Sequence, residues 1–236
     1  FINLQSLGNL PKLKENQVSE INNIDDLNNF LKDKKSDIFQ KSIEDYCIGI
    51  KNLNEKSNFK SFFLASPKPD AIKTLVNIIS SKILSNTKVK VVLIETNFES
   101  PKLGKFLNSK SSNGLLDYLV NEKIKISEII NKSNISDYLD IISAGNDSSS
   151  NTMLLGSLRM KELIEHLKNS YQYIIVDGSS INDSPVSAVN GNLSDLTTLL
   201  ISTNNLKKSD LVKSVDKLSK AGSNIDAILV IDQELK

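Results

Sequence analysis

Short apolar runs alternate with helical patterns along this chain, and this alternation limits the fold more than any other feature of the sequence. Mostly continuous apolar runs of four to seven residues suit strands that are buried on both faces. Helical patterns lie between most of the runs, and one amphipathic helical pattern from Ser36 precedes the first. The sequence therefore predicts an α/β fold with three layers, in which a mainly parallel central sheet is flanked by helices. The predicted strands are 62–65, 89–94, 139–142, 173–176, 196–201 and 225–231, and the helices between them 71–84, 115–120, 158–167 and 209–221, the last ending at Gly222 as a C-cap.

Composition narrows the range of functions. A length of 236 residues suits one domain or at most two small ones, and a formal net charge of +1 argues against a nucleic-acid partner held by global basicity. With one cysteine, Cys47, and one histidine, His166, the chain has neither an internal disulfide nor a Cys/His zinc cluster. A metal held by carboxylates stays open. No run of 18 apolar residues occurs.

The first part of the chain differs in composition from the rest. Residues 1–35 are rich in Asn, Lys and Asp, with scattered Leu and Ile. We expect this stretch to be a loosely packed arm or linker. The folded domain is then expected to span residues 36–236.

A helix start follows the first predicted strand, where a phosphate-binding loop would lie. Lys73 and Thr74 open this helix, as the Lys-Ser/Thr pair does in the loop G-x-x-x-x-G-K-[ST]. Both are therefore candidate nucleotide-binding residues, with Thr74 also a candidate Mg²⁺ ligand. The glycines are missing, because none lies between Gly49 and Gly104. Ile72 stands where glycine would let the backbone turn, and Asp70 adds an unfavourable negative charge beside a bound polyphosphate.

Two further strand ends carry carboxylates. Glu95 ends the second predicted strand and is a candidate catalytic base, whereas Asn97, two residues on, cannot accept a proton in that role. Asp177 ends the fourth predicted strand after four apolar residues, a pattern typical of a carboxylate presented to Mg²⁺. The plain alternative for each is a polar strand end, and for Lys73 and Thr74 an ordinary helix start.

The order of these segments resembles the cytoplasmic domain of bacterial tyrosine kinases, the BY-kinase branch of the MinD/ParA-like P-loop proteins. The segment from Leu7 to Pro11 resembles the L-G-x-x-P motif that follows the last membrane-spanning helix in fused members of that family. Residues 154–163 are similar to the family's L-L-x-S-x-R-M-x-x-L stretch, and Tyr171 to Asp177 resembles its Walker B strand. The resemblance implies a P-loop NTPase fold, with a membrane anchor outside this chain leading into residues 1–35.

Departures from the family pattern gather at the nucleotide site. The segment 94–101 matches the family's Walker A′ motif, but Glu95 and Asn97 replace two aspartates and Glu99 replaces an arginine. The family's E-x-x-R-x-x-R oligomerisation motif is also changed, to Lys41, Glu44 and Cys47. Persistence of the core with loss of site residues suggests that the fold outlived the activity.

The resemblance thus implies the cytoplasmic module of an exopolysaccharide or lipopolysaccharide chain-length and export regulator, at the cytoplasmic face of the bacterial inner membrane. We expect a pseudokinase with weak or no Mg-ATP binding that acts by self-association and assembly with the polysaccharide machinery. One alternative is an active ATP-dependent tyrosine autokinase, in which Lys73 and Thr74 hold phosphate and metal, Asp177 holds Mg²⁺ and Glu95 activates the hydroxyl. A second is a MinD/ParA-like positioning ATPase.

Overall fold

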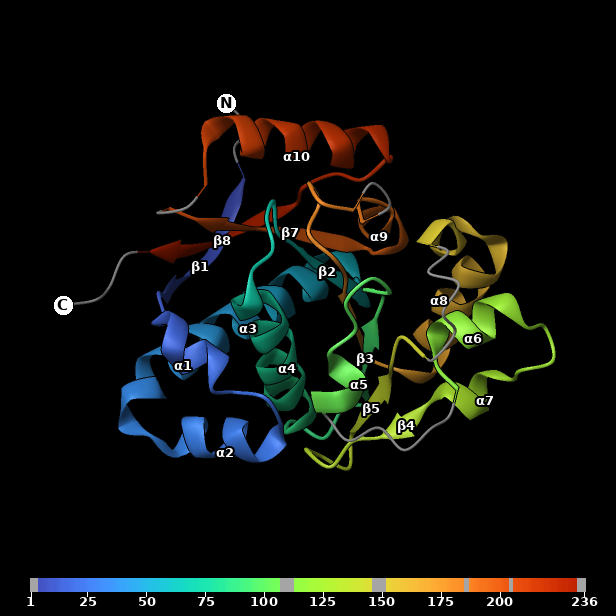
Figure 1. Cartoon of the computed structure of the whole chain (residues 1–236), viewed down its shortest axis with the longest axis horizontal. Coiled ribbons are helices and arrows are strands. Elements are labelled where there is room, and N and C mark those ends of the chain that lie inside the picture. The colour runs from blue at the N-terminus through green and yellow to red at the C-terminus, as the bar shows by residue number, and fades with distance from the viewer. Residues whose placement is uncertain (1–3, 107–112, 146–151, 185–186, 204–205, 233–236) are drawn as a thin grey trace.

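The computed structural model describes residues 4–106, 113–145, 152–184, 187–203 and 206–232. Its centre is a single twisted sheet (Figure 1). Within those residues the sheet has eight strands in the order β1-β8-β7-β2-β6-β3-β5-β4. Neighbouring strands are parallel except β4 and β5. The strands are β1 (Gln5–Pro11), β2 (Ser61–Ala65), β3 (Val91–Glu95), β4 (Asn131–Lys132), β5 (Leu139–Ile142), β6 (Tyr173–Asp177), β7 (Leu196–Ser202) and β8 (Ala227–Asp232).

Helices cover both faces of this sheet, which confirms the predicted three-layer α/β fold. Side chains of α2, α3 and α4 pack in one core with one face of the sheet, and those of α6, α8, α9 and α10 pack in a second core on the other. The helices are α1 (Glu15–Ser19), α2 (Ile24–Lys32), α3 (Asp37–Ser57), α4 (Ala71–Ser85), α5 (Leu103–Phe106), α6 (Leu115–Val120), α7 (Ile126–Ile129), α8 (Leu158–Ser170), α9 (Val189–Leu193) and α10 (Lys208–Lys220), with 3-10 turns at Lys34–Ser36 and Thr152–Gly156.

The central strands are mostly apolar because each contributes side chains to both cores. In β2, Phe62 and Leu64 belong to one core and Phe63 to the other. Alternate side chains of a strand point to opposite faces, so a strand between two helical layers needs apolar residues at every position. The glycine predicted to end α10 lies one residue beyond the C-cap, Ala221, and its φ of +79° is a conformation that glycine adopts without strain.

Residues 5–11 differ from the loosely packed arm that the sequence predicts. They form the edge strand β1, which pairs in parallel with β8, the first and last colours of Figure 1 side by side. Leu7 and Leu10 are buried in the core shared with α3, and Leu27 of α2 joins them. The expectation that the packed core begins only after residue 35 is therefore wrong. The proposed link from this stretch to a membrane anchor stays a prediction.

The strand β1 cannot be recognised from the sequence, because its pairing register with β8 is interrupted. The pairing with β8 shifts between Ser6 and Asn9, and Gly8, inside the shift, has φ of +149°. A bulge of this kind inserts an extra residue and breaks the alternation by twos. Leu7 and Leu10, three positions apart, are thus both buried.

No helix in the described part of the chain is long and apolar enough to cross a membrane.

Truncation of Leu10 tests whether β1 belongs to the cooperative fold. Leu10 is 1% exposed, so Leu10→Ala should lower the free energy of unfolding by about 2–5 kcal/mol through lost burial and the cavity left behind. Urea denaturation measures the change. Ile48→Ala, at a side chain that is 54% exposed on α3, is the control and should change stability by less than about 1 kcal/mol. Equal, small effects of the two variants would show that β1 is not part of the core.

Asp195 fixes the start of β2 beside β7. Its carboxylate accepts hydrogen bonds from the amides of Lys60 and Ser61, at 2.9 and 3.0 Å, and pairs with the Lys168 ammonium of α8 at 2.7 Å. Burial alone would raise the pKa of Asp195, but the hydrogen bonds from Lys168 and from the two amides outweigh it and lower the pKa below its ordinary value. Asp195, just before β7, therefore links the start of β2 to α8.

The lowered pKa gives Asp195 a defined pH dependence. The charged form stabilises the fold above the unfolded-state pKa of 3.8, and this contribution is lost as the pH falls through the lower folded-state value. Asp195→Asn should therefore reduce stability by about 1 kcal/mol at neutral pH, and the difference from the unmodified protein should shrink below about pH 4. Urea midpoints across this pH range measure it. A difference that stays constant with pH would rule out the charged interaction as its origin, and Asp216→Asn on the exposed face of α10 is the matched control.

Candidate functional site

The candidate residues meet where three adjacent strands end. β2, β6 and β3 are neighbours in the sheet, and their carboxyl ends lie at one edge of it. Asp177 ends β6 and is paired in register with Glu95 at the end of β3, while β2 leads into the loop at 66–70 and then into α4. Ligands of parallel sheets bind beyond this edge.

Asp177 is the acceptor on which the start of α4 converges. The Thr74 hydroxyl donates to Oδ2 of Asp177 at 2.9 Å, and the Asn77 side-chain amide donates to Oδ1 at 2.8 Å. The Lys73 ammonium lies 3.3 Å from Oδ1 and donates to the backbone carbonyl of Gly178. We call Lys73, Thr74, Asn77 and Asp177 the Asp177 cluster.

Three of the four residues of the Asp177 cluster are buried, and Thr74 is half-buried. Lys73, Asn77 and Asp177 are 4%, 3% and 3% exposed. Buried charges are tolerated when they are paired and their remaining hydrogen-bonding capacity is met, and here the lysine has two acceptors and the carboxylate three donors. The cluster therefore ties α4 to β6 as a structural unit, whatever else it binds.

Asp70 begins α4 as its N-cap. Its Oδ1 accepts the amide hydrogen of Ile72 at 2.9 Å, an amide that would otherwise be free at the helix start. Burial raises the pKa of Asp70, against the opposing effects of the Ile72 hydrogen bond and the nearby Lys73 charge. A carboxylate of this chain thus already bonds an amide at the helix end where a phosphate-binding loop would receive phosphate.

Glu95 is occupied by backbone amides. Its Oε1 accepts from Lys102 and Leu103 at 2.5 and 2.7 Å, and its Oε2 accepts from Ala144 at 3.1 Å. Burial raises the pKa of Glu95 in spite of these hydrogen bonds, and the neighbouring Asp177 charge raises it further. The carboxylate joins the start of α5 and the end of β5 to β3, so its lone pairs are engaged in structure.

The loops around the site are held by polar contacts. Asn97 accepts a hydrogen bond from the Ser179 hydroxyl at 2.9 Å, joining the segments after β3 and β6. On the other side, the carbonyls of Ser66 and Pro67 accept from the amides of Ile181 and Asn182 at 2.8 and 3.1 Å. Within the described residues, no group of three or more His, Cys, Asp and Glu side chains is placed to hold a metal.

The structure brings several predicted site residues into direct contact. Lys73 and Thr74 contact Asp177, while Asp70 lies one turn away in the loop and Glu95 on the next strand bonds elsewhere. Asn77 was not predicted. Its signal was a polar residue four positions after Lys73, flanked by apolar residues on both sides, which places the two on one face of the helix.

Comparison with known proteins identifies the relatives of this chain. No family model matches it. The putative tyrosine-protein kinase in cps region of Klebsiella pneumoniae is 31% identical over 170 residues, which are 71% of this chain and 23% of that protein. The tyrosine-protein kinase CpsD of Streptococcus pneumoniae is 25% identical over 193 residues, 80% of this chain and 83% of that protein. The chain is a homologue of bacterial tyrosine-protein kinases.

Solved structures agree with this relationship at the level of the fold. The kinase domain of the Escherichia coli tyrosine kinase ETK superposes on this chain with a TM-score of 0.85 at 18% identity. The superposition covers 99% of this chain and 92% of the ETK domain. The septum site-determining protein MinD of Pyrococcus horikoshii, complexed with Mg-ADP, superposes with a TM-score of 0.58 at 19% identity, over 73% and 69% of the two chains. The fold is therefore that of the BY-kinase and MinD/ParA-like P-loop proteins.

Removal of the Asp177 carboxylate tests how much the Asp177 cluster contributes to the stability of this kinase homologue. Asp177→Ala leaves the ammonium of Lys73 buried without its charged partner, so we expect a loss of about 3–5 kcal/mol in the free energy of unfolding. Chemical denaturation measures it. Asp216→Ala, which breaks an exposed ion pair on α10, is the control and should cost no more than about 0.5 kcal/mol. A loss below about 1 kcal/mol in Asp177→Ala would contradict a buried, mutually paired cluster.

Proposed function

We propose that this homologue is a pseudokinase: a cytoplasmic BY-kinase-like domain of a polysaccharide chain-length and export regulator that binds Mg-ATP weakly or not at all. It acts by self-association and by assembly with the polysaccharide synthesis machinery, held at the inner membrane by an anchor outside this chain. The relatives in cps regions support the polysaccharide setting. Since the chain matches only 23% of the Klebsiella protein, the activity of such a whole protein is part of the proposal.

The state of Lys73 carries the proposal. In a phosphate-binding loop this lysine reaches β- and γ-phosphates. Here Lys73 is only 4% exposed. Its ammonium contacts the Asp177 carboxylate and donates to the Gly178 carbonyl. Binding a nucleotide through Lys73 would require breaking these contacts in the buried cluster.

The remaining residues fit Mg-ATP only in part. Thr74 and Asp177 stand side by side, 2.9 Å between oxygens, an arrangement that suits a hydroxyl and a carboxylate around Mg²⁺. The phosphate side does not fit, because the loop lacks glycine, Asp70 occupies the Ile72 amide, and its negative charge repels phosphate. We therefore assign no phosphoryl-transfer step to this site.

An active ATP-dependent tyrosine autokinase is the first alternative. The contact of Lys73 and Thr74 with Asp177 favours it, since these three residues are the ones that would hold phosphate and metal. Glu95 would then need to release its backbone amides to act as a base. A MinD/ParA-like positioning ATPase is the second alternative, and the fold is its support.

Calorimetric titration with Mg-ATP separates these functions. We expect no measurable binding below about 1 mM nucleotide, because binding requires displacement of buried contacts of Lys73 and approach to the Asp70 charge. The kinase domain of ETK, titrated in parallel, is the reference protein.

Two variants on the same helix make the titration decisive. Lys73→Ala removes the cluster lysine, and Lys82→Ala near the end of α4 is its control, each checked for a folded state by thermal unfolding. Micromolar binding of Mg-ATP that Lys73→Ala abolishes and Lys82→Ala keeps would overturn the pseudokinase proposal in favour of the kinase.

A further inference from the structure

One of the five tyrosines differs from the others in its exposure to solvent. All five lie among the residues that the structure describes. Tyr138 is 41% exposed, whereas the remaining four are 4–8% exposed (Tyr46, Tyr118, Tyr171 and Tyr173). An enzyme that acts on a tyrosine hydroxyl of the folded chain therefore reaches Tyr138 without any change in the fold.

The four buried tyrosines are held in place by their surroundings. The Tyr171 hydroxyl donates to the Asp140 carboxylate at 2.7 Å, and the Arg159 guanidinium lies over the Tyr118 ring, 4.1 Å from its centroid. The other two rings belong to the core on the α3 side of the sheet (Tyr46 and Tyr173). A phosphate group has a charge of about −1.5 to −2 and cannot stay buried without partners, so its transfer to any of these four requires local opening of the fold.

Tyr138 lies in a short turn between β4 and β5. The Ser136 hydroxyl accepts from the Tyr138 amide at 3.2 Å, and the Ser136 carbonyl accepts from the Leu139 amide at 3.1 Å. Asn134 and Asp137 in the same turn are exposed as well. Exposed turns are the parts of a folded chain that other enzymes reach most easily, because the backbone on either side is open to them.

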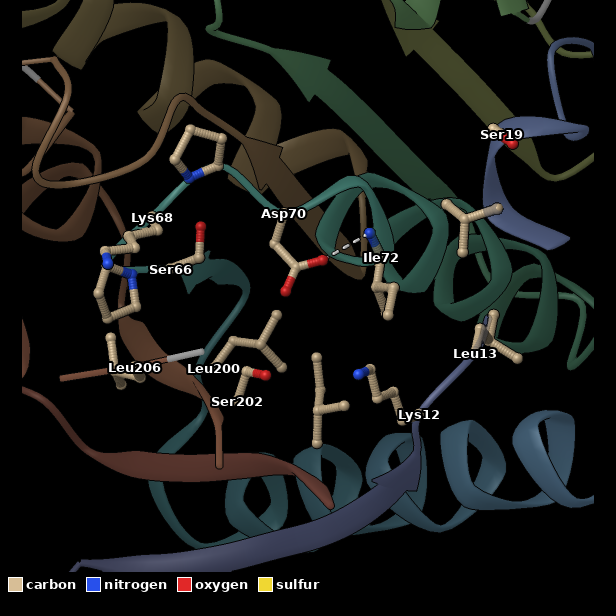
Figure 2. A pocket seen from close by; sticks show the side chains of 14 residues that line it. Lys12, Leu13, Ser19, Ser66, Lys68, Asp70, Ile72, Leu200, Ser202 and Leu206 are labelled. Atoms are coloured by element: carbon tan, nitrogen blue, oxygen red, sulfur yellow. Dashed lines mark hydrogen bonds between the residues drawn. The ribbon is translucent and has the colours of Figure 1, made fainter. Parts of the chain in front are cut away.

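This turn is at the opposite end of the strands from the candidate site. Leu139, the first residue of β5, pairs with Val91, the first residue of β3, and β3 ends at Glu95 beside the site. These four steps along β3 span roughly 13 Å. Figure 2 shows the loop at 66–70 and the start of α4, which follow the carboxyl end of β2. A phosphoryl donor at that end cannot reach Tyr138 of the same chain.

Basic side chains lie close to Tyr138. The Val91 amide donates to the Tyr138 carbonyl at 2.9 Å, so Lys90 lies beside Tyr138 on the neighbouring strand. Lys90 and Lys88 are both exposed, and Asp137 is the acidic neighbour within the turn. Two ammonium groups against one carboxylate give this surface a positive balance. A phosphate on Tyr138 would therefore remain in water, with part of its charge compensated.

We propose that Tyr138 is a phosphorylation site, at which a separate, active bacterial tyrosine kinase modifies this chain. The Tyr138 hydroxyl oxygen attacks the γ-phosphorus of Mg-ATP held by that kinase, and the bond from this phosphorus to the β,γ-bridging oxygen breaks. ADP leaves, and the hydroxyl proton passes to a base of the kinase. The inference rests on the proposed function in one respect, namely that the phosphoryl donor is bound by another protein.

Phosphorylation in vitro tests the site directly. The full chain is incubated with Mg-ATP alone, with Mg-ATP and the ETK kinase domain, and with Mg-ATP and the streptococcal CpsD. Trypsin cuts after Lys and Arg, so Tyr138 is the single tyrosine of the peptide 133–159, and mass spectrometry locates the phosphate. We expect phosphate in this peptide with an added kinase, and at least about tenfold less on the buried tyrosines, whose exposure requires local opening.

Two conservative variants isolate the acceptor. Tyr138→Phe should lower the incorporated phosphate about tenfold or more, because the buried tyrosines react only after local opening. Tyr118→Phe is the matched control, since it removes a hydroxyl from a ring that is 7% exposed, and it should leave incorporation unchanged. Both variants and the phosphorylated chain should melt within about 2 °C of the unmodified protein, because none of them changes the volume of the core.

The outcomes distinguish this inference from the proposed function. No phosphate with either kinase, incorporation that Tyr138→Phe leaves intact, or phosphate mainly on a buried tyrosine overturns the inference, as does a phosphorylated chain that has lost its fold. Phosphate on Tyr138 with Mg-ATP alone would overturn the proposed function and keep Tyr138 as the acceptor. Transfer to Tyr138 only when a kinase is added supports both.

Discussion

The carboxylate of Asp177 holds the start of α4 against the centre of the sheet. It accepts from Thr74 and Asn77 and faces the ammonium of Lys73, all within the first two turns of one helix. The loop before the helix inherits its position from these contacts, and so does Asp70 as the helix cap. One buried ionic cluster therefore fixes where the loop that follows β2 meets α4.

Much of the fold could be predicted because the central strands are apolar on both faces. Runs such as 62–65 and 173–176 lie within a residue of the observed β2 and β6. The first strand could not be predicted, since a bulge at Gly8 removes the alternation that marks a strand, and only Leu7 and Leu10 along it are buried. The edge strand β1 forms because it pairs with β8, which lies far away in the sequence, and its own residue pattern does not predict it.

The site could be predicted in its positions but not in its bonding. Placing Lys73, Thr74 and Asp177 at strand and helix ends was enough to bring them together, because parallel strands end at one edge. The bonds that Glu95 makes to Lys102, Leu103 and Ala144 depend on the path of loops that carry no pattern of their own. Whether a carboxylate is free to react is decided by such partners, and sequence order does not give them.

The pairing of β1 with β8 joins the two ends of the chain, with Gln5 beside Ala227. Contacts between residues so far apart in sequence raise the contact order, and loop closure must precede any gain from them. During synthesis the first strand has no partner until the last strand has left the ribosome. We therefore expect this edge to be the last part of the sheet to form, only after β8 has been synthesised.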